Sequence, residues 1–263
     1  MTTPIKRVLD RLGLARPVFR LRERWRALHG SGRSVAASDG LAVPPARLMV
    51  LVTGSADGAW FLEGGRLAAA SIRQALLDAG IRPADFSSIL DFGCGCGRVI
   101  RHWRSLPAKL HGADCNPNSI AWCRRHLPFA EFQANTLEPR LDYADQQFDF
   151  AYALSVLTHT REDLQQPWMN ELWRVLKPGG YLLITTQGEE YLPKLTNAER
   201  YLYSRGQVVV RHANAAGTNL CSSYHSDRCV RERLAGNFSV ILSRPRAAAG
   251  NGNQDVYLLR RPR

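Results

Sequence analysis

Apolar positions along this chain follow two different periods. Short apolar runs predict buried strands at residues 89–92, 109–114, 130–134, 148–156, 181–187, 238–243 and 254–260. Apolar residues spaced three or four positions apart predict helices at 66–79, 98–106, 119–126, 162–176 and 227–234. Strands that alternate with helices favour an α/β fold with a parallel sheet, and the last two strands favour a hairpin.

The residues ahead of this pattern are expected to form a helical extension. Residues 5–12 place their apolar side chains on one helical face, and residues 18–28 continue the amphipathic pattern. Such a helix can cover a cofactor site, pack on the domain, or lie on a membrane or a partner. We favour a lid or a packed helix, because the apolar face is modest for a surface anchor. The extension is placed at 1–58 and the main domain at 59–263, with an insertion at 188–222.

The stretch 89–98 carries the strongest chemical signal. Gly93, Gly95 and Gly97 follow a predicted strand at every second position. Glycine lets the backbone turn tightly and approach a ligand, and a helix after the turn would add unpaired N–H groups. Asp91 ends the first strand, and Asp114 ends the next one 23 residues later. This spacing fits the acidic residue that hydrogen-bonds a ribose in dinucleotide-type folds.

Three more motifs accompany the glycine turn, at residues 112–114, 148–152 and 171–180. With residues 91–98 they form an ordered set, reading DFGCGCGR, GAD, FDFAY and ELWRVLKPGG. Over residues 60–190 the chain therefore resembles the class I S-adenosylmethionine (SAM)-dependent methyltransferases. The resemblance implies a Rossmann-like fold whose seven-stranded sheet has six parallel strands and one antiparallel strand. It also implies SAM as the cofactor.

The resemblance further implies which side chains bind SAM. Asp114 is expected to accept hydrogen bonds from the ribose hydroxyls, Asn135 to recognise adenine, and Arg98 to pair with the carboxylate of the methionine half. Alternatives are a helix cap for Asp114, a turn asparagine for Asn135, and a surface arginine for Arg98. The complete expected set is Asp91, Gly93, Cys94, Gly95, Gly97, Arg98, Asp114, Cys115, Asn135, Thr136, Leu154 and Ser155.

The catalytic candidates follow the fourth predicted strand and the insertion. His159 is the candidate base, because the free pKa of histidine lies near neutrality; it is an equally good structural residue beside the next helix. Tyr152, Tyr224 and His225 complete the candidate set, although Tyr224 and His225 also suit a helix start. Aromatic residues 60 and 61 can contact a sulfonium or belong to the core.

Charge and cysteine content indicate which kinds of partner and ligand to expect. The formal charge is +12, and it comes from the two ends: residues 1–33 carry +7 and residues 227–263 carry +5. We favour an arginine-rich solvated surface over a nucleic-acid partner, because no nucleic-acid-binding motif accompanies the charge. No apolar run reaches the ~18 residues of a membrane span, so stable membrane insertion is not expected. The N-terminus lacks the apolar core of a signal peptide, so we expect a cytoplasmic protein. The cysteine spacing does not predict a metal site.

The resemblance leaves the reaction open. We expect methyl transfer to a small molecule, such as a secondary metabolite or a glycan precursor. The alternative is cyclisation of SAM itself, in which its amine attacks its own γ-carbon to give azetidine-2-carboxylate and 5′-methylthioadenosine. A non-catalytic SAM-binding protein is the third interpretation. The first two reactions use the same cofactor residues, so the sequence does not separate them, and it leaves the oligomeric state open.

Overall fold

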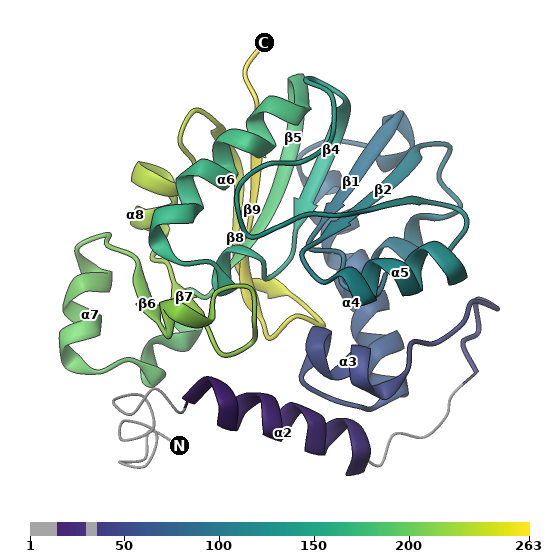
Figure 1. Ribbon diagram of the computed structural model, residues 1–263. Coiled ribbons are helices and arrows are strands. Elements are labelled where there is room, and N and C mark those ends of the chain that lie inside the picture. The colour runs from purple at the N-terminus through teal and green to yellow at the C-terminus, as the bar shows by residue number, and fades with distance from the viewer. Residues whose placement is uncertain (1–14, 30–35) are drawn as a thin grey trace.

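A seven-stranded sheet forms the centre of the molecule in the computed structural model, which describes residues 15–29 and 36–263 (Figure 1). Its strands are β1 (Ser88–Phe92), β2 (Lys109–Asp114), β3 (Glu131–Ala134), β4 (Phe148–Ala153), β5 (Leu176–Thr186), β8 (Ser239–Ala248) and β9 (Gln254–Arg260). The order is β3-β2-β1-β4-β5-β9-β8. Only β9 runs antiparallel to its neighbours in this sheet, β5 and β8, which confirms the predicted six-plus-one arrangement.

Helices cover both faces of this sheet (Figure 1). The helices are α2 (Ala15–His29), α3 (Ala46–Thr53), α4 (Gly58–Asp78), α5 (Pro117–His126), α6 (Glu162–Val175), α7 (Asn197–Ser204) and α8 (Asp227–Cys229), which continues as a π-helix over Val230–Leu234. Alternate strand residues face opposite layers: Ile89 packs in the cluster that contains α4 and α5 residues, whereas Leu90 packs in the cluster that contains α6 residues. This two-sided burial explains the nearly continuous apolar runs of the parallel strands.

The first crossover differs from the prediction. An α-helix was expected at 98–106, but the structure has turns and a short 3₁₀-helix, Ile100–Trp103. Residues 98–103 are all buried except the half-buried His102, so this stretch lacks the broad exposed face of an amphipathic helix. The Arg101 guanidinium pairs with Asp39 at 2.6 Å, which neutralises its buried charge.

Helix α4 begins eight residues before its predicted start at residue 66. The Asp57 carboxylate caps it by accepting hydrogen bonds from the backbone N–H groups of Ala59 and Trp60 at 2.9 and 3.2 Å. In the sequence, the glycine pair at 64–65 suggests that no helix continues through these positions. In the fold, Gly65 allows close packing, because a Cβ atom there would lie 2.3 Å from the Arg98 carbonyl oxygen.

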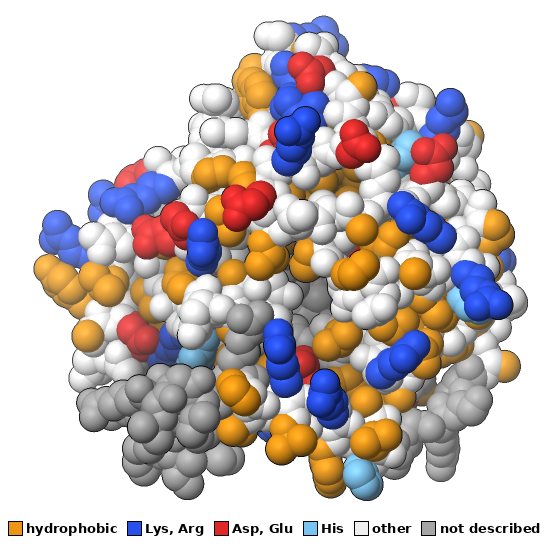
Figure 2. All heavy atoms as spheres, viewed as in Figure 1, with side chains coloured by type: hydrophobic (Ala, Val, Ile, Leu, Met, Phe, Trp, Pro, Cys, Tyr) orange, Lys and Arg blue, Asp and Glu red, His pale blue; other side chains and the backbone are white. Residues whose placement is uncertain are grey.

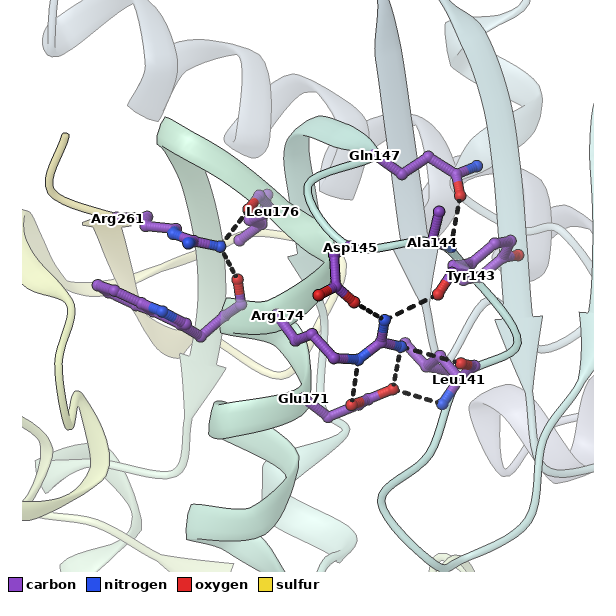
Figure 3. A network of polar contacts seen from close by, with 10 residues as sticks. Leu141, Tyr143, Ala144, Asp145, Gln147, Glu171, Arg174, Leu176 and Arg261 are labelled. Atoms are coloured by element: carbon purple, nitrogen blue, oxygen red, sulfur yellow. Dashed lines mark hydrogen bonds and ion pairs between the residues drawn. The ribbon is translucent and has the colours of Figure 1, made fainter.

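The motif at 171–180 has a structural role at the end of α6 (Figure 3). The Arg174 guanidinium donates to both carboxylate oxygens of Glu171 at 2.7 and 2.9 Å. It also donates to the carbonyl oxygens of Leu141 and Tyr143 and to the carboxylate of Asp145. One planar, permanently charged group therefore fixes the loop between β3 and β4 against α6, at a distance from the cavity described below.

Two outlying parts frame the carboxyl ends of the central strands. Helices α2 and α3 pack against each other on one side (Figure 1). On the other, residues 188–222 include α7, strand β6 (Val209–Arg211) and a short ladder with β7 (Ser222–Tyr224). The helical pattern expected at 5–12 lies outside the described residues. Within residues 15–29 and 36–263, no helix is both long and apolar enough to cross a membrane.

Candidate active site

A cavity of about 300 Å³ opens at the carboxyl ends of β1, β2, β3 and β4. This is the edge of an open parallel sheet at which ligands bind. Most of the expected SAM-binding residues line it: Asp91, Gly93, Cys94, Gly95, Arg98, Asp114, Cys115, Asn135, Thr136, Leu154 and Ser155. Among the catalytic candidates, His159 alone lines it. The fold thus brings together side chains from four strand ends that are far apart in the sequence.

The glycine turn closes one wall of this cavity. Gly93 and Gly95 have φ angles of 79° and 53°, which residues with a Cβ atom adopt with strain. A Cβ atom at Gly93 would lie 2.2 Å from Val156, and one at Gly95 would lie 2.6 Å from Val52. Gly97 is different: it packs against Leu127 and is not part of the cavity lining. We therefore remove Gly97 from the expected cofactor contacts and assign it to the packing of the turn.

Asp114 links the glycine turn to the start of α5. Its carboxylate accepts hydrogen bonds from the backbone N–H groups of Gly95 and Asn116, both at 2.8 Å. Burial raises the pKa of this carboxyl group, and the two backbone hydrogen bonds oppose the rise. Each carboxylate oxygen keeps a further lone pair, which suits the two hydroxyl groups of a ribose. The alternative cap of α5 is Asn116, whose Oδ1 accepts from the N–H groups of Asn118 and Ser119.

Asn135 offers an unsatisfied acceptor to the cavity. Its Nδ2 donates to the Thr136 carbonyl oxygen at 2.6 Å, while its buried Oδ1 has no hydrogen-bond partner. A buried polar atom without a partner is costly, and a ligand N–H group would satisfy it. The exocyclic amine of adenine is such a donor. Asp114 and Asn135 together therefore fit the nucleoside part of SAM.

Arg98 lines the cavity, but its guanidinium already has partners. It donates to the Gly250 carbonyl oxygen at 3.0 Å and to Asn251 Oδ1 at 3.2 Å, both in the loop between β8 and β9. Its Nε atom is buried without a partner. Burial lowers the pKa of this group, and the nearby Asp91 opposes the shift. The proposed pairing with the SAM carboxylate stays a prediction, in competition with this loop.

Asp91 is the buried acid at the base of the cavity. Burial raises the pKa of its carboxyl group to about 7, while contact with Tyr152 and the charge of Arg98 act in the opposite direction. Tyr152 itself is fully buried and packs beside Trp103 and Phe150, with ring centroids 6.2 and 5.8 Å away. It does not line the cavity, so we remove it from the catalytic candidates.

Ser155 is held in an unusual backbone conformation at the end of β4. Its φ angle of 62° lies in the left-handed region, which is strained for a residue other than glycine. Its N–H donates to Thr185 Oγ1 at 2.8 Å, and its hydroxyl lies 2.9 Å from Thr158 Oγ1 and accepts from Gln254 Nε2 at 2.7 Å. These hydrogen bonds hold Ser155 in its strained conformation and fix the turn that leads to His159.

His159 has one ring nitrogen fixed by the protein. Its Nδ1 lies 2.7 Å from the Cys221 carbonyl oxygen, an acceptor that requires a proton on Nδ1. Burial lowers the pKa of the imidazole, which keeps the ring neutral near pH 7. In the neutral tautomer with a proton on Nδ1, Nε2 carries the lone pair. His159 thus lies at the cavity as a neutral imidazole, and its role as a base stays a prediction.

The other two catalytic candidates, Tyr224 and His225, follow the insertion and are packed in the interior. Tyr224 lies in an apolar cluster with Tyr191 and Tyr203. His225 is fully buried, and its Nε2 lies 3.0 Å from Gln165 Oε1. Burial lowers the pKa of His225 to about 4. Neither side chain lines the cavity, and neither do the aromatic residues 60 and 61, so all four leave the candidate site.

The cavity has further lining residues that the sequence did not indicate. They come from outside the motifs: Glu23, Leu51 and Val52 from the extension, Leu164 and Trp168 from α6, residues 216–219 from the insertion, and Asn251. Their placement depends on tertiary packing. One local signal was available, namely Gly217, which has a φ angle of 77° and whose added Cβ atom would lie 2.5 Å from Leu137.

Comparison with known proteins relates the middle part of this chain to a family. Residues 90–184 match the family described as "Methyltransferase domain". Malonyl-[acyl-carrier protein] O-methyltransferase from Enterobacter lignolyticus is 33% identical over 44% of this chain and 45% of its own length. Mouse mitochondrial ubiquinone biosynthesis O-methyltransferase is 29% identical over 42% of this chain and 31% of its own. The chain thus spans less than half the length of these two curated relatives.

Solved structures show the same fold at lower identity. A SAM-dependent methyltransferase from Methanosarcina mazei matches 71% of this chain and 97% of its own, with a TM-score of 0.53 and 21% identity. The 1,6-didemethyltoxoflavin N1-methyltransferase of Burkholderia thailandensis, solved with S-adenosylhomocysteine, matches 77% of this chain and 80% of its own, with a TM-score of 0.53 and 22% identity. Residues 90–184 therefore match a methyltransferase domain, and the chain shares the fold of SAM-dependent methyltransferases of known structure.

Proposed function

We propose that the protein transfers the methyl group of SAM to an oxygen atom of a small molecule. The observation that carries the proposal is the neutral His159 imidazole in the cavity, with Nδ1 held at 2.7 Å from the Cys221 carbonyl oxygen. A hydroxyl acceptor must lose a proton, and a positioned imidazole is suited to take it. The names of both curated relatives describe O-methyltransferases, which supports an oxygen acceptor.

The chain's own residues divide the work between binding and proton transfer. Asp114 and Asn135 hold the nucleoside and the glycine turn lies against it. SAM supplies an electrophilic methyl group bonded to a positively charged sulfur. His159 Nε2 takes the acceptor's proton as the acceptor oxygen bonds to the methyl carbon and the C–S bond breaks. Catalysis depends mainly on holding the oxygen in line with that bond, at about 3–3.5 Å.

The extension and the insertion define the acceptor side in this proposal. Leu51 and Val52 come from residues 1–58, and Gly217 and Thr218 come from the insertion at 188–222. Apolar side chains at this side exclude water, which strengthens the electrostatic interactions inside the site. Within small molecules, we retain secondary metabolites and glycan precursors as the classes that the sequence favours.

Cyclisation of SAM is less well supported by the site. For this reaction the sequence offered a closed pocket around the methionine half, built from Tyr152, Ser155, His159, Tyr224 and aromatic residues near Trp60. Ser155 and His159 line the cavity, whereas Tyr152 and Tyr224 are buried elsewhere and do not contribute to its wall. Among the residues that the structure describes, no tyrosine lines the cavity. We therefore give methyl transfer precedence.

The proposal is tested with SAM that carries an isotopic label in its methyl group. The full-length protein is incubated with labelled SAM and a small-molecule extract, and labelled products are separated by mass spectrometry. We expect S-adenosylhomocysteine and a labelled O-methyl product from the native protein, and much less of both from His159→Asn. His126→Asn, on α5 and outside the cavity lining, is the matched control. Equal product from His159→Asn and the control would contradict the role of the base.

A further inference from the structure

Helix α2 has two different long faces. Phe19, Glu23 and Arg26 are half-buried on the inner face, where Glu23 lines the cavity and Arg26 donates to the Gly54 carbonyl oxygen at 3.1 Å. The outer face carries apolar side chains at spacings of three, four and three residues, which place them in one stripe. The members of this stripe, and their exposed fractions, are Val18 (45%), Leu21 (68%), Trp25 (59%) and Leu28 (80%).

Arginines border this apolar stripe along the helix. Arg20, Arg22 and Arg24 are all exposed, and with Arg26 they outnumber the single acidic residue of α2, Glu23. Figure 2 shows apolar and basic side chains together along the lower edge of the molecule, where α2 lies in Figure 1. A large exposed apolar stripe on a helix marks an interaction surface, because it costs free energy in water.

We propose that α2 docks the protein reversibly on an anionic phospholipid surface. Two properties of the stripe, its apolar side chains and its bordering arginines, indicate a lipid surface as the partner. Leucine and tryptophan side chains that project from one helix face suit the boundary between headgroups and acyl chains, and tryptophan favours that boundary in particular. Arginines on both sides of the stripe match a negatively charged surface, to which each contributes about a twofold to tenfold gain in affinity.

In this proposal, α2 contacts the membrane with one face and the cavity with the other. Its inner face carries Glu23 at the cavity, and its outer face carries Trp25 and Leu21, which are free to enter the lipid. Docking needs no spanning helix and no rearrangement of the sheet. The sequence favoured a lid or a packed helix on the ground that the apolar face is modest. In the part of the chain that the structure describes, this face is exposed, so α2 contributes Glu23 to the cavity wall and keeps a second surface for lipid.

Vesicle sedimentation tests the docking. The full-length protein is mixed with phosphatidylcholine vesicles that contain phosphatidylglycerol at about one part in three, or with phosphatidylcholine vesicles alone. We expect binding to the anionic vesicles, weaker binding to the neutral ones, and a loss of binding as salt is raised. No binding to the anionic vesicles at low salt would overturn the proposal.

Two sets of substitutions test whether the vesicles bind to α2 or to another part of the surface. The pair Leu21→Gln and Trp25→Gln removes most of the stripe, and the triple Arg20→Gln, Arg22→Gln and Arg24→Gln removes the bordering charge. Each set should weaken binding to anionic vesicles by about tenfold or more, with SAM affinity unchanged as evidence of folding.

Leu77→Gln with Ile241→Gln is the matched control, since both side chains are exposed apolar residues outside α2. The control should bind the anionic vesicles as the native protein does. Equal binding by the control and both α2 variants would contradict docking through α2. So would a concentration-dependent dimer that the Leu21→Gln and Trp25→Gln pair abolishes, because the stripe would then cover a second copy of the chain.

Discussion

The Nδ1 atom of His159 lies 2.7 Å from the carbonyl oxygen of Cys221, although 62 residues separate them in the sequence. This contact joins the loop after β4 to the end of the insertion. It fixes the tautomer of the imidazole and so determines which nitrogen can accept a proton. The inferred reaction depends on this contact more than on any single motif of the sequence.

The pH dependence of methyl transfer should reflect this environment. Burial lowers the pKa of His159, so the neutral base persists below the usual histidine range. We expect kcat to be flat near neutral pH and to fall only as the pH drops below about 6.5, because protonation then removes the lone pair. His159→Asn should lower kcat by about a hundredfold or more at pH 7 without changing SAM affinity. A change confined to SAM affinity would indicate a binding role instead.

Substitution of Asp114 should weaken SAM binding. Asp114→Ala removes the acceptor for the ribose hydroxyls and leaves the N–H groups of Gly95 and Asn116 without their partner. We expect a loss of about 1.5–3 kcal/mol in binding free energy, measured by calorimetric titration. Asp142→Ala, an exposed acid outside the cavity, is the control and should bind as the native protein does. Unchanged affinity in Asp114→Ala would remove Asp114 from the ribose site.

The buried carboxyl group of Asp91 should make stability depend on pH. Its folded pKa is raised to about 7, so its contribution to stability is complete below the unfolded pKa and is lost as the pH rises through 7. In Asp91→Asn the side chain does not ionise, so this loss of stability at high pH does not occur. Relative to the native protein, the variant should therefore gain about 2–3 kcal/mol in unfolding free energy at pH 8 compared with pH 5.

Urea unfolding of the ligand-free protein at both pH values measures this difference. The control is Asp142→Asn, whose side chain is exposed and whose substitution should leave the pH dependence as it is. If Asp91→Asn and the native protein show the same change in stability between the two pH values, Asp91 titrates normally in the fold.

Gly95 should resist substitution for two separable reasons. An added Cβ atom would lie 2.6 Å from Val52 Cγ2, and the φ angle of 53° is strained for alanine. We expect Gly95→Ala to cost about 1–3 kcal/mol of stability, and a second substitution, Val52→Ala, to restore the part caused by the contact. The double-mutant cycle, measured by urea unfolding, gives that part as the coupling energy. A coupling energy of zero would show that the conformational strain alone limits this position.

The sheet and the nucleoside side of the cavity were predictable because short-range patterns determine them. A buried parallel strand needs a continuous apolar run, and a turn at positive φ needs glycine, so β1 and Gly93 are visible in the sequence. The crossover at 98–106 was not predictable in the same way. Its apolar residues suit a helix, but Arg101 and Trp103 are buried as well, which only the packed fold reveals.

The acceptor side could not be predicted because long-range contacts place it. Tyr224 and His225 have the chemistry of catalytic residues, but both are buried away from the cavity. Leu51 and Val52 carry no chemical signal, yet they line it. The outer face of α2 was visible as a pattern, but its exposure depends on which face the fold buries.

The nucleoside product formed from SAM tests the central claim most directly. The full-length protein is incubated with SAM alone and with SAM plus a small-molecule extract, beside a boiled control and Asp114→Ala. Methyl transfer predicts S-adenosylhomocysteine only when the extract is present, in an amount that Asp114→Ala reduces. Enzyme-dependent 5′-methylthioadenosine together with azetidine-2-carboxylate, formed from SAM alone, would contradict methyl transfer and leave the cofactor contacts as described.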